Sequence, residues 1–444
     1  MEKFNNLGSI MSILALVCIL MLFSMWIIAS KSDKFEQSHE NYFFANRNVS
    51  SLFLAGTIVA TQVGGGSIVG VTDDAFAIGW WALIYPASQT LGLILIALFY
   101  TETLQSMKLS TVSEIFTRYY HSEALRKIAS NLSALSLFFI LVAQGVATKH
   151  LLISIGFSEM WLFGVVWLTV VTYTALGGFS VVVKTDLIQV AFIVISLLAM
   201  LYYLHDIPSG HKALTVNTRD VTDWFRLANI FTWATAYMFI EQDMIQRFVS
   251  AKSTPILKSA LWTSVIALMA IGCLPAFIGT TAHDIGINLS SASSSVLVQT
   301  ALTYTPKWVY LLVSFGILMA ILSTVDSLMS AISSLLVIDR TYQKNHNPVL
   351  ITAIIGVSAL LLASVTDEII NTLVSAYALT SSALFVPVFC VINQKPISQK
   401  SAWSAVIAGI ASYILLYIFY SKLTFLALAI SGAAAAITQL IEKR

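Results

Sequence analysis

Charged residues are scarce in this sequence. Asp, Glu, Lys and Arg make up 10% of the 444 residues, whereas a soluble globular domain carries about 25%. The formal net charge is only +2, which argues against a nucleic-acid partner, because nucleic acids are held by concentrated positive charge. Hydrophobic residues make up 57% of the chain. The composition therefore excludes an ordinary soluble domain and predicts a membrane protein.

Cysteine is also rare, with three residues, Cys18, Cys273 and Cys390. Each lies within an apolar run, which predicts packing against other helices rather than a disulfide framework or a metal cage. The sequence contains no CxxC, HExxH, P-loop or dinucleotide-binding motif. Because no nucleophile–base pair is visible either, we do not expect an intramembrane hydrolase.

The chain contains many long apolar runs. Runs of ~17 residues or more can cross a bilayer as helices. Thirteen occur, near residues 8–29, 51–71, 80–100, 125–155, 159–178, 182–204, 224–247, 257–282, 307–338, 347–364, 368–393, 402–420 and 422–439. The first is too long for a signal-peptide core, so we expect it to be retained. The longest loops are too short to fold alone, which predicts a transporter, channel, receptor or intramembrane enzyme that works within the bilayer.

The basic residues indicate how the chain crosses the membrane. With the N-terminus outside, 17 of the 24 lysines and arginines fall in cytoplasmic loops, as the positive-inside rule requires. An odd number of helices then places the C-terminus in the cytoplasm. The expected location is the plasma membrane, which is the inner membrane of a Gram-negative bacterium.

The segment ATQVGGGSIVG, residues 60–70, is poor material for the interior of a membrane helix. Each glycine costs a helix about 1 kcal/mol relative to alanine. Gly66 and Gly70 form a GxxxG pair, which predicts close packing of two helices. Packing alone gives no role to the neighbouring Thr61 and Gln62. We therefore favour a broken helix whose freed carbonyl oxygens bind a cation near the middle of the membrane.

Serines line one face of a later apolar run, AILSTVDSLMSAISS at residues 320–334. They recur at spacings of four, three and four residues, which is one side of a helix. The last two, Ser330 and Ser334, are interpreted as bonding to their own helix or to a neighbouring helix. Asp326 lies among them, and a buried carboxylate needs a cation, a proton or a basic partner.

Two further segments carry polar residues at membrane depth, where such residues are costly. In TALGGFSVVVKTDLIQ, residues 174–189, the Gly-Gly pair is expected to end one helix. Asp186 then either caps the next helix or belongs to a functional site. In AYMFIEQDMIQR, residues 236–247, Glu241 is either solvated at an early helix end or buried. We favour burial, because Arg247 suggests that the helix continues for another turn.

Four segments together resemble the sodium:solute symporter family, whose members include transporters for sugars, proline, pantothenate, choline and sialic acid. They are NYFFANRNVSSLFLAGTIVATQVGGGSIVG, YTALGGFSVVVKTDLIQ, EQDMIQRFVSAKS and ILSTVDSLMSAISS. Their order and spacing extend the resemblance over nearly the whole chain. VGGG in the second helix and the later MIQRFVSAKS look most like the choline and proline branches.

The resemblance implies an all-α polytopic membrane protein of about 13 transmembrane helices, with a five-plus-five inverted-repeat core and discontinuous helices. It divides the chain into an N-terminal helix and cytoplasmic loop, a first repeat unit, an extracellular loop, a second repeat unit and two C-terminal helices. These cover residues 1–50, 51–204, 205–223, 224–393 and 394–444. The sequence itself contributes the polar interruption in the first helix of each proposed unit.

The resemblance also implies sodium as the coupling ion. The main sodium site of the family uses carbonyl oxygens of the broken second helix with a carbonyl and two hydroxyls of the ninth. By motif these fall on Ala60, Val63, Ala320, Ser323 and Thr324. Neutral oxygens suit a hard monovalent cation and hold it loosely enough to release it. Some members have a further cation site, which here would add Asp186, Asp326 and Ser327 and share Ser323.

The same resemblance implies which residues contact the solute. They are Gln62, Gly64, Ser67, Tyr85, Gln89, Tyr237, Glu241 and Gln242. Choline-type members place aromatic cage residues where Gln62 and Glu241 stand here, and this difference weakens a choline assignment. A carboxylate at residue 241 can still attract a cationic or zwitterionic solute.

The predicted function is sodium-coupled import of a small organic solute by alternating access, with no enzymatic activity. The candidate solutes are an amino acid, a betaine or another amine-bearing compound such as proline or choline. Two alternatives stay open. One is a proton-coupled transporter of the same fold that uses Glu241, Asp326 or Asp186. The other is a transporter-like sensor or an uncoupled channel. The expected partners are the solute and the lipid bilayer.

Overall fold

The structure is a computed structural model that describes residues 38–155, 160–205, 223–288, 295–339, 347–365 and 370–443, together with residues 27, 157 and 207. Apart from residue 27, the first predicted membrane helix, residues 8–29, lies outside the described residues. Most of the predicted extracellular loop, residues 205–223, lies outside them as well.

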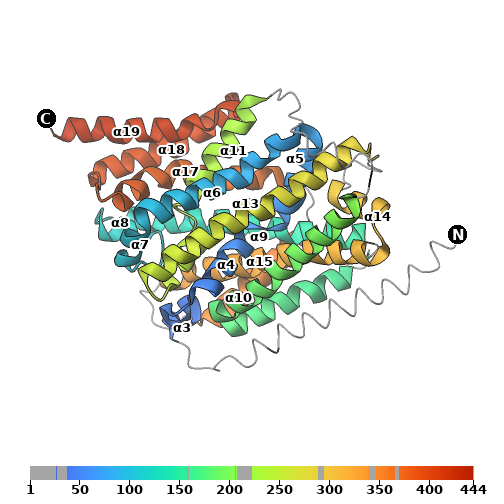
Figure 1. Cartoon of the computed structure of the whole chain (residues 1–444). Coiled ribbons are helices and arrows are strands. Elements are labelled where there is room, and N and C mark those ends of the chain that lie inside the picture. The colour runs from blue at the N-terminus through green and yellow to red at the C-terminus, as the bar shows by residue number, and fades with distance from the viewer. Residues whose placement is uncertain are drawn as a thin grey trace.

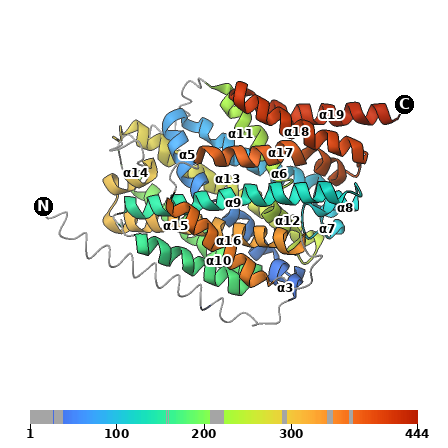
Figure 2. The same cartoon turned by 180° about the vertical axis from the view of Figure 1, so that it is seen from behind.

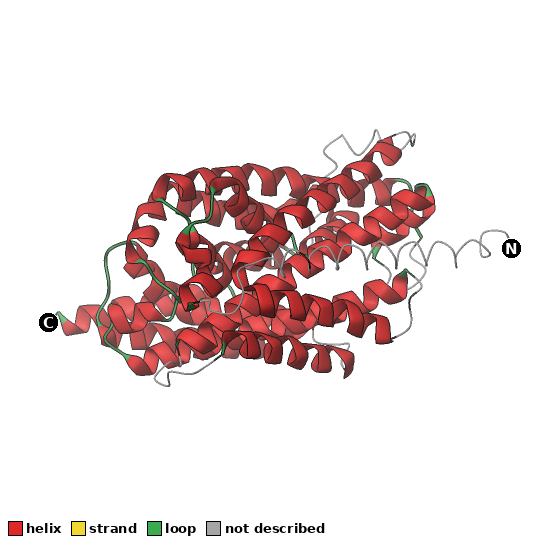
Figure 3. Ribbon diagram, turned by 90° about the horizontal axis from the view of Figure 1, so that it is seen from below, coloured by secondary structure: helices red, strands yellow, loops and turns green. Residues whose placement is uncertain are grey.

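The described residues form helices joined by turns and loops (Figure 3). The helices are, in chain order, α3 (His39–Phe44), η1 (Ala45–Arg47), α4 (Ser51–Gln62), α5 (Gly65–Ile78), η2 (Gly79–Leu83), α6 (Ile84–Leu95), the π-helical η3 (Ile96–Tyr100), α7 (Thr101–Met107), α8 (Glu114–Arg118), α9 (Glu123–Ser154), α10 (Met160–His205), α11 (Trp224–Tyr237), α12 (Gln242–Ser250), α13 (Thr254–Asp284), α14 (Val296–Tyr304), α15 (Lys307–Ile338), α16 (Pro348–Val365), α17 (Ile370–Ile392), α18 (Gln399–Phe419), η5 (Ser421–Leu423) and α19 (Leu426–Glu442).

Seven helices among the described residues are long and apolar enough to cross a membrane. They are Gly65–Met107, Glu123–Ser154, Met160–His205, Thr254–Asp284, Lys307–Ile338, Pro348–Val365 and Gln399–Phe419. Shorter apolar helices, such as α4 and α19, lie beside them in the bundle (Figure 1). The predicted all-helical multi-pass architecture is confirmed, while the count of thirteen helices stays a prediction.

α15 is the central helix of the bundle. It packs against α10, α9, α16, α4 and α5, and side chains on all its faces are buried between Val313 and Leu335. α18 and α19 lie along the opposite edge of the molecule from α10 (Figures 1 and 2). A helix that is apolar all round belongs in the interior of a large bundle. The serines and Asp326 of α15 are therefore held at the centre of the protein.

Gly178 divides α10 into two parts, as the sequence predicts. Its φ of +57° is left-handed, a conformation that L-residues other than glycine adopt at a cost. A side chain there would also meet Tyr42, because a Cβ atom would lie 2.6 Å from the Tyr42 carbonyl oxygen. The predicted spans 159–178 and 182–204 correspond to the two parts, and the second part presents Asp186 to the core.

α5 extends further than the sequence predicts, to Ile78 rather than to residue 71. The two aspartates near its end have partners that let the helix continue. Asp73 accepts a hydrogen bond from the backbone nitrogen of Val296 at 3.0 Å, and Asp74 pairs with Arg226 at 2.6 Å. Asp73 thereby caps α14, a short helix that the apolar pattern did not predict.

Candidate functional site

The helix predicted over residues 51–71 is broken at Val63 and Gly64. α4 ends at Gln62, Val63 adopts φ −92° and ψ 55°, and Gly64 is extended before α5 begins. A Cβ on Gly64 would lie 2.6 Å from Thr324 Oγ1, and one on Gly65 would lie 2.4 Å from Ile321 Cγ1. These two glycines therefore let the break lie directly against α15.

The predicted packing role of Gly66 and Gly70 is not met by any helix that the structure describes. Apart from the backbone of α5 itself, no heavy atom of the described residues lies within 4 Å of a Cβ built on either glycine. The GxxxG spacing is present in the sequence, but Gly66 is exposed and Gly70 is half-buried. The close approach occurs two residues before Gly66.

The break and α15 bring together the oxygens of the predicted sodium site. The Ser323 hydroxyl donates to the Ala60 carbonyl at 3.1 Å and to the Ala320 carbonyl at 3.0 Å. The Thr324 hydroxyl donates to the Ala320 carbonyl at 3.2 Å. Val63 lies at the break itself and is 5% exposed. Two helices thus supply neutral carbonyl and hydroxyl oxygens, which are the ligands a hard cation prefers.

A second break faces the first one. α11 ends at Tyr237, a turn follows, and Glu241 is extended before α12 starts at Gln242. The break brings the Glu241 carboxylate to Gln62, whose Nε2 donates to Glu241 Oε2 at 3.1 Å. Of the two readings of Glu241, burial is therefore confirmed, since its exposed fraction is 8%. The predicted helix over residues 224–247 is not continuous, because it ends at Tyr237 and a separate helix, α12, begins at Gln242.

A chain of polar side chains extends from Glu241 to α6. Gln89 Nε2 donates to Gln62 Oε1 at 2.5 Å and to the Tyr85 hydroxyl at 3.2 Å. Four of the eight predicted solute residues therefore form one connected network. Tyr237 joins it through the backbone, because its carbonyl accepts from the Glu241 nitrogen at 2.9 Å.

A small cavity of about 20 Å³, room for about one water molecule, lies beside this network. Its polar lining comes from Gln62, Ser67 and Gln89, and its apolar lining from α5, α6 and α13. Ser67 belongs to the first turn of α5, where its hydroxyl donates to the Gly64 carbonyl at 2.8 Å. The α4–α5 break, which carries candidate sodium ligands, therefore also forms one side of the cavity.

Gln242 does not join the predicted solute residues. Its side-chain amide accepts from the Val112 nitrogen at 2.8 Å and donates to the Ser110 carbonyl and the Ser334 hydroxyl, each at 3.1 Å. One turn later, Gln246 donates to Ser330 Oγ at 2.9 Å. The interpretation of Ser330 and Ser334 as partners of a neighbouring helix is confirmed, and that helix is α12.

Arg247 follows Gln246 on α12 and also bonds to a serine of α15. It lies deeper in the bundle than the sequence suggests. Its side chain is 0% exposed. Its guanidinium donates to Ser327 Oγ at 2.6 Å, to the Thr57 carbonyl at 3.1 Å and to the Asp243 carbonyl at 2.9 Å. It also pairs with Asp186 at 3.5 Å. The sequence assigned Arg247 only to a helix end, whereas it is the cationic centre of a buried cluster.

The residues of the possible second cation site surround this guanidinium. Asp186 accepts a short hydrogen bond from Thr57. Asp326 accepts from the Tyr173 hydroxyl at 2.8 Å and lies 3.5 Å from Ser327 Oγ. The structure therefore brings Asp186, Asp326 and Ser327 together, but with a fixed positive charge already among them. Thr57 carried no signal in the sequence, since it is a single polar residue in an apolar run, and Tyr173 was not singled out there either.

A protein family and several known proteins are similar to this chain in sequence. The model of the sodium:solute symporter family matches residues 42–424. The osmoregulated proline transporter OpuE of Bacillus subtilis is 25% identical over 411 residues, which is 84% of this chain and 82% of that protein. The sodium/pantothenate symporter of Haemophilus influenzae is 30% identical over 183 residues, 39% of this chain and 38% of that protein.

Solved structures share the fold. A Na⁺-coupled sialic acid symporter, in a substrate-bound outward-open state, superposes with a TM-score of 0.82 at 17% identity and covers 97% of this chain and 96% of its own. Mhp1, a nucleobase-cation-symport-1 family transporter, superposes in a closed conformation with a TM-score of 0.63 at 13% identity, covering 92% and 95%. At these identities the likeness concerns the arrangement of helices alone.

Proposed function

This chain belongs to the sodium:solute symporter family, and on that premise we propose that it couples the import of a small organic solute to sodium by alternating access. It is a multi-pass membrane transporter and not an enzyme. The observation that carries the proposal is the contact between the α4–α5 break and one turn of α15. Carbonyl and hydroxyl oxygens of Ala60, Ala320, Ser323 and Thr324 meet there.

Sodium at this contact would act by joining two parts of the protein. Ala60 and Val63 belong to the broken helix, whereas Ala320, Ser323 and Thr324 belong to α15. A cation held by both would favour the conformation in which they touch, and it can bias the states only by its different affinity for each. The membrane potential would add about 2.3 kcal/mol per charge for each 100 mV.

We propose that the solute binds at the small cavity beside Gln62, Ser67 and Gln89, with Gly64, Tyr85, Tyr237 and Glu241 next to it, and that this cavity widens to admit the solute. Gln242 is left out of this set because its amide is bonded elsewhere. The Glu241 carboxylate favours a solute that carries an amine. The similarity to a proline transporter supports an amino acid as the first candidate.

We also propose the repeat organisation and the orientation. Residues 51–204 and 224–393 would be the two inverted units, and each begins with a broken helix, α4–α5 or α11–α12. The N-terminus would lie outside and the C-terminus in the cytoplasm of a bacterial plasma membrane. The excess of basic residues in the loops predicted to be cytoplasmic supports this orientation.

A thermal-shift screen of the purified protein tests the function. Amino acids, betaines, sugars and carboxylates would be added in sodium chloride and in potassium chloride of equal ionic strength. A ligand of the native state raises the melting temperature, so we expect one solute class, with L-proline tested first, to stabilise the protein more strongly in sodium. The proposal would be overturned if every stabilising solute acted equally in the two salts.

The Glu241→Gln variant tests the solute site separately from the sodium site. The variant keeps the size of the side chain and its contact with Gln62 but removes the charge. We expect the concentration of an amine-bearing solute needed for half-maximal stabilisation to rise about tenfold, because a charge-assisted hydrogen bond is lost. The sodium concentration for half-maximal stabilisation should change less than about twofold. Unchanged affinity for every stabilising solute would remove Glu241 from the site.

A proton-coupled transporter of the same fold is the second candidate, and one observation favours it. Asp186 and Asp326 lie in one buried cluster with a single guanidinium, that of Arg247. Glu241 and Asp243 are buried near the same guanidinium, so the carboxylates outnumber the cation. A proton, or a second cation at Asp186, Asp326 and Ser327, would neutralise part of this excess negative charge. Uptake driven by a pH gradient in the absence of sodium would identify this mechanism. Downhill leakage alone would identify the uncoupled channel.

A further inference from the structure

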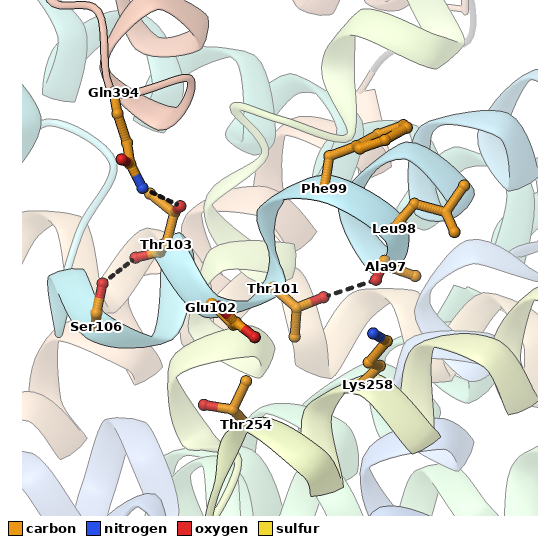
Figure 4. Close-up of a pocket in the computed structure, with 10 residues that line it drawn as sticks. All are labelled: Ala97, Leu98, Phe99, Thr101, Glu102, Thr103, Ser106, Thr254, Lys258 and Gln394. Carbon is orange, nitrogen blue, oxygen red and sulfur yellow. Dashed lines mark hydrogen bonds between the residues drawn. The ribbon is translucent and has the colours of Figure 1, made fainter.

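A second cavity lies apart from the proposed transport site, at the end of the bundle where α7 and α13 meet. It has a volume of about 460 Å³. Its walls come from η3 and α7, from the first two turns of α13 and from the turn after α17 (Figure 4). None of the residues proposed for sodium or solute lines it. The basic loops predict that this end of the bundle is cytoplasmic.

The walls of this cavity carry one charge of each sign. Glu102 extends from α7 and Lys258 from α13 toward the space between the two helices (Figure 4). Both side chains are exposed, and within the described ranges neither forms an ion pair with a protein group. The hydroxyls of Thr101, Thr103 and Ser106 lie around them. The cavity is therefore suited to a small zwitterionic group.

The cavity opens at the boundary of the lipid-facing surface. Leu98 and Phe99 line it and are 51% and 66% exposed, and Ile266, two turns along α13 from Lys258, is 70% exposed. Leu98 and Phe99 belong to the π-helical turn η3, and such turns are frequent at functional sites. Apolar side chains thus continue from the rim of a charged cavity along the face that acyl chains would cover.

We propose that this cavity binds the headgroup of a phospholipid that carries a primary amine, such as phosphatidylethanolamine. Lys258 would donate to the phosphate, and Glu102 would accept from the ammonium group. The acyl chains would lie over Leu98 and Phe99. A quaternary ammonium headgroup has no N–H to donate to Glu102, and a headgroup with only negative charge would be repelled by it. These contacts select for the primary amine.

Native mass spectrometry of the purified protein tests the proposal, in detergent that contains defined lipids and neither sodium nor solute. The wild-type protein should retain phosphatidylethanolamine at least about fivefold more than phosphatidylcholine or phosphatidylglycerol, the selectivity expected of one charge-assisted hydrogen bond. Lys258→Ala should lower retention of phosphatidylethanolamine by a similar factor. Glu102→Gln should bring the ratio of phosphatidylethanolamine to phosphatidylcholine close to one.

Lys252→Ala is the matched control, because Lys252 is an exposed lysine near the start of α13 that does not line the cavity. It should retain lipid as the wild type does. Soluble glycerophosphoethanolamine should not compete at equal concentration, since it lacks the acyl chains. Competition by it would show a soluble ligand instead, and equal retention of all lipids by wild type and variants would overturn the proposal. The measurement needs no transport, so its failure leaves the proposed function intact.

Discussion

Replacing Ser323 and Thr324 together by alanine should raise the sodium concentration that gives half-maximal thermal stabilisation at least about tenfold, a loss of ~1.4 kcal/mol of binding free energy. Both hydroxyls lie at the contact with the α4–α5 break, within 3.2 Å of the Ala60 or Ala320 carbonyl. Alanine keeps the helix and removes two of the five proposed oxygen ligands. Sodium would then be left with three carbonyl oxygens, too few for a hard cation.

Ser314→Ala is the matched control for this experiment. Ser314 lies on the same helix and is 1% exposed, and its hydroxyl donates only to the Tyr310 carbonyl of its own helix. Its removal should leave the sodium dependence within about twofold of the wild type. Choline chloride at equal ionic strength corrects for general salt effects. If the double variant and the control respond to sodium alike, the sodium site is not at this contact.

The break in the first helix could be predicted because its cause is local. The glycines at residues 64–66 are costly inside a helix, and the structure interrupts the helix there. The Glu-Gln-Asp run at 241–243 predicted a polar interruption in a helix that continues to Arg247, whereas the structure breaks the helix before Gln242. The bounds of α15, Lys307–Ile338, equal the predicted run because apolar length defines them. The serine face of α15 was also visible from its spacing alone.

The partners of these residues could not be predicted, because they come from distant parts of the chain. In the sequence, Arg247 can be recognised only as a charge near a helix end. The fold brings Thr57, Asp186 and Ser327 to its guanidinium. Gln242 adjoins Glu241 in sequence, but the first residue of a new helix points its side chain elsewhere. Gly66 and Gly70 fit a packing motif, yet a motif does not say which face of α5 meets another helix.

The contacts of α12 with α15 suggest how the two sites could be coupled. Gln242, Gln246 and Arg247 bond to Ser334, Ser330 and Ser327, so serines on successive turns of α15 are held by one short helix. The proposed sodium contact lies at the next turn of α15, at Ser323. Because Glu241 directly precedes α12, any movement of α12 away from α15 would also displace the carboxylate of the proposed solute site. α15 and α12 would thus connect the proposed cation site to the proposed solute site through packed, hydrogen-bonded elements.

Replacing Arg247 by methionine should lower the free energy of unfolding by about 3–5 kcal/mol, since breaking a buried ion pair leaves an uncompensated charge. Methionine fills a similar volume, so the loss would come from the unpaired Asp186 and from the hydrogen bonds that Thr57 and Ser327 no longer receive, rather than from a cavity. Adding Asp186→Asn to this variant removes the unpaired charge of Asp186. It should recover about half or more of the lost free energy of unfolding. Unfolding by a denaturing detergent in mixed micelles measures the three free energies.

Arg226→Met is the matched control, because Arg226 also pairs with an aspartate but does so at the surface. The side chains of Arg226 and Asp74 are 49% and 29% exposed, so the change should cost less than about 1 kcal/mol. If Arg247→Met were as stable as Arg226→Met, the buried guanidinium would contribute nothing to holding α12 against α15. If the double variant were no better than Arg247→Met alone, the cost would lie in the lost serine and threonine contacts and not in the charge of Asp186.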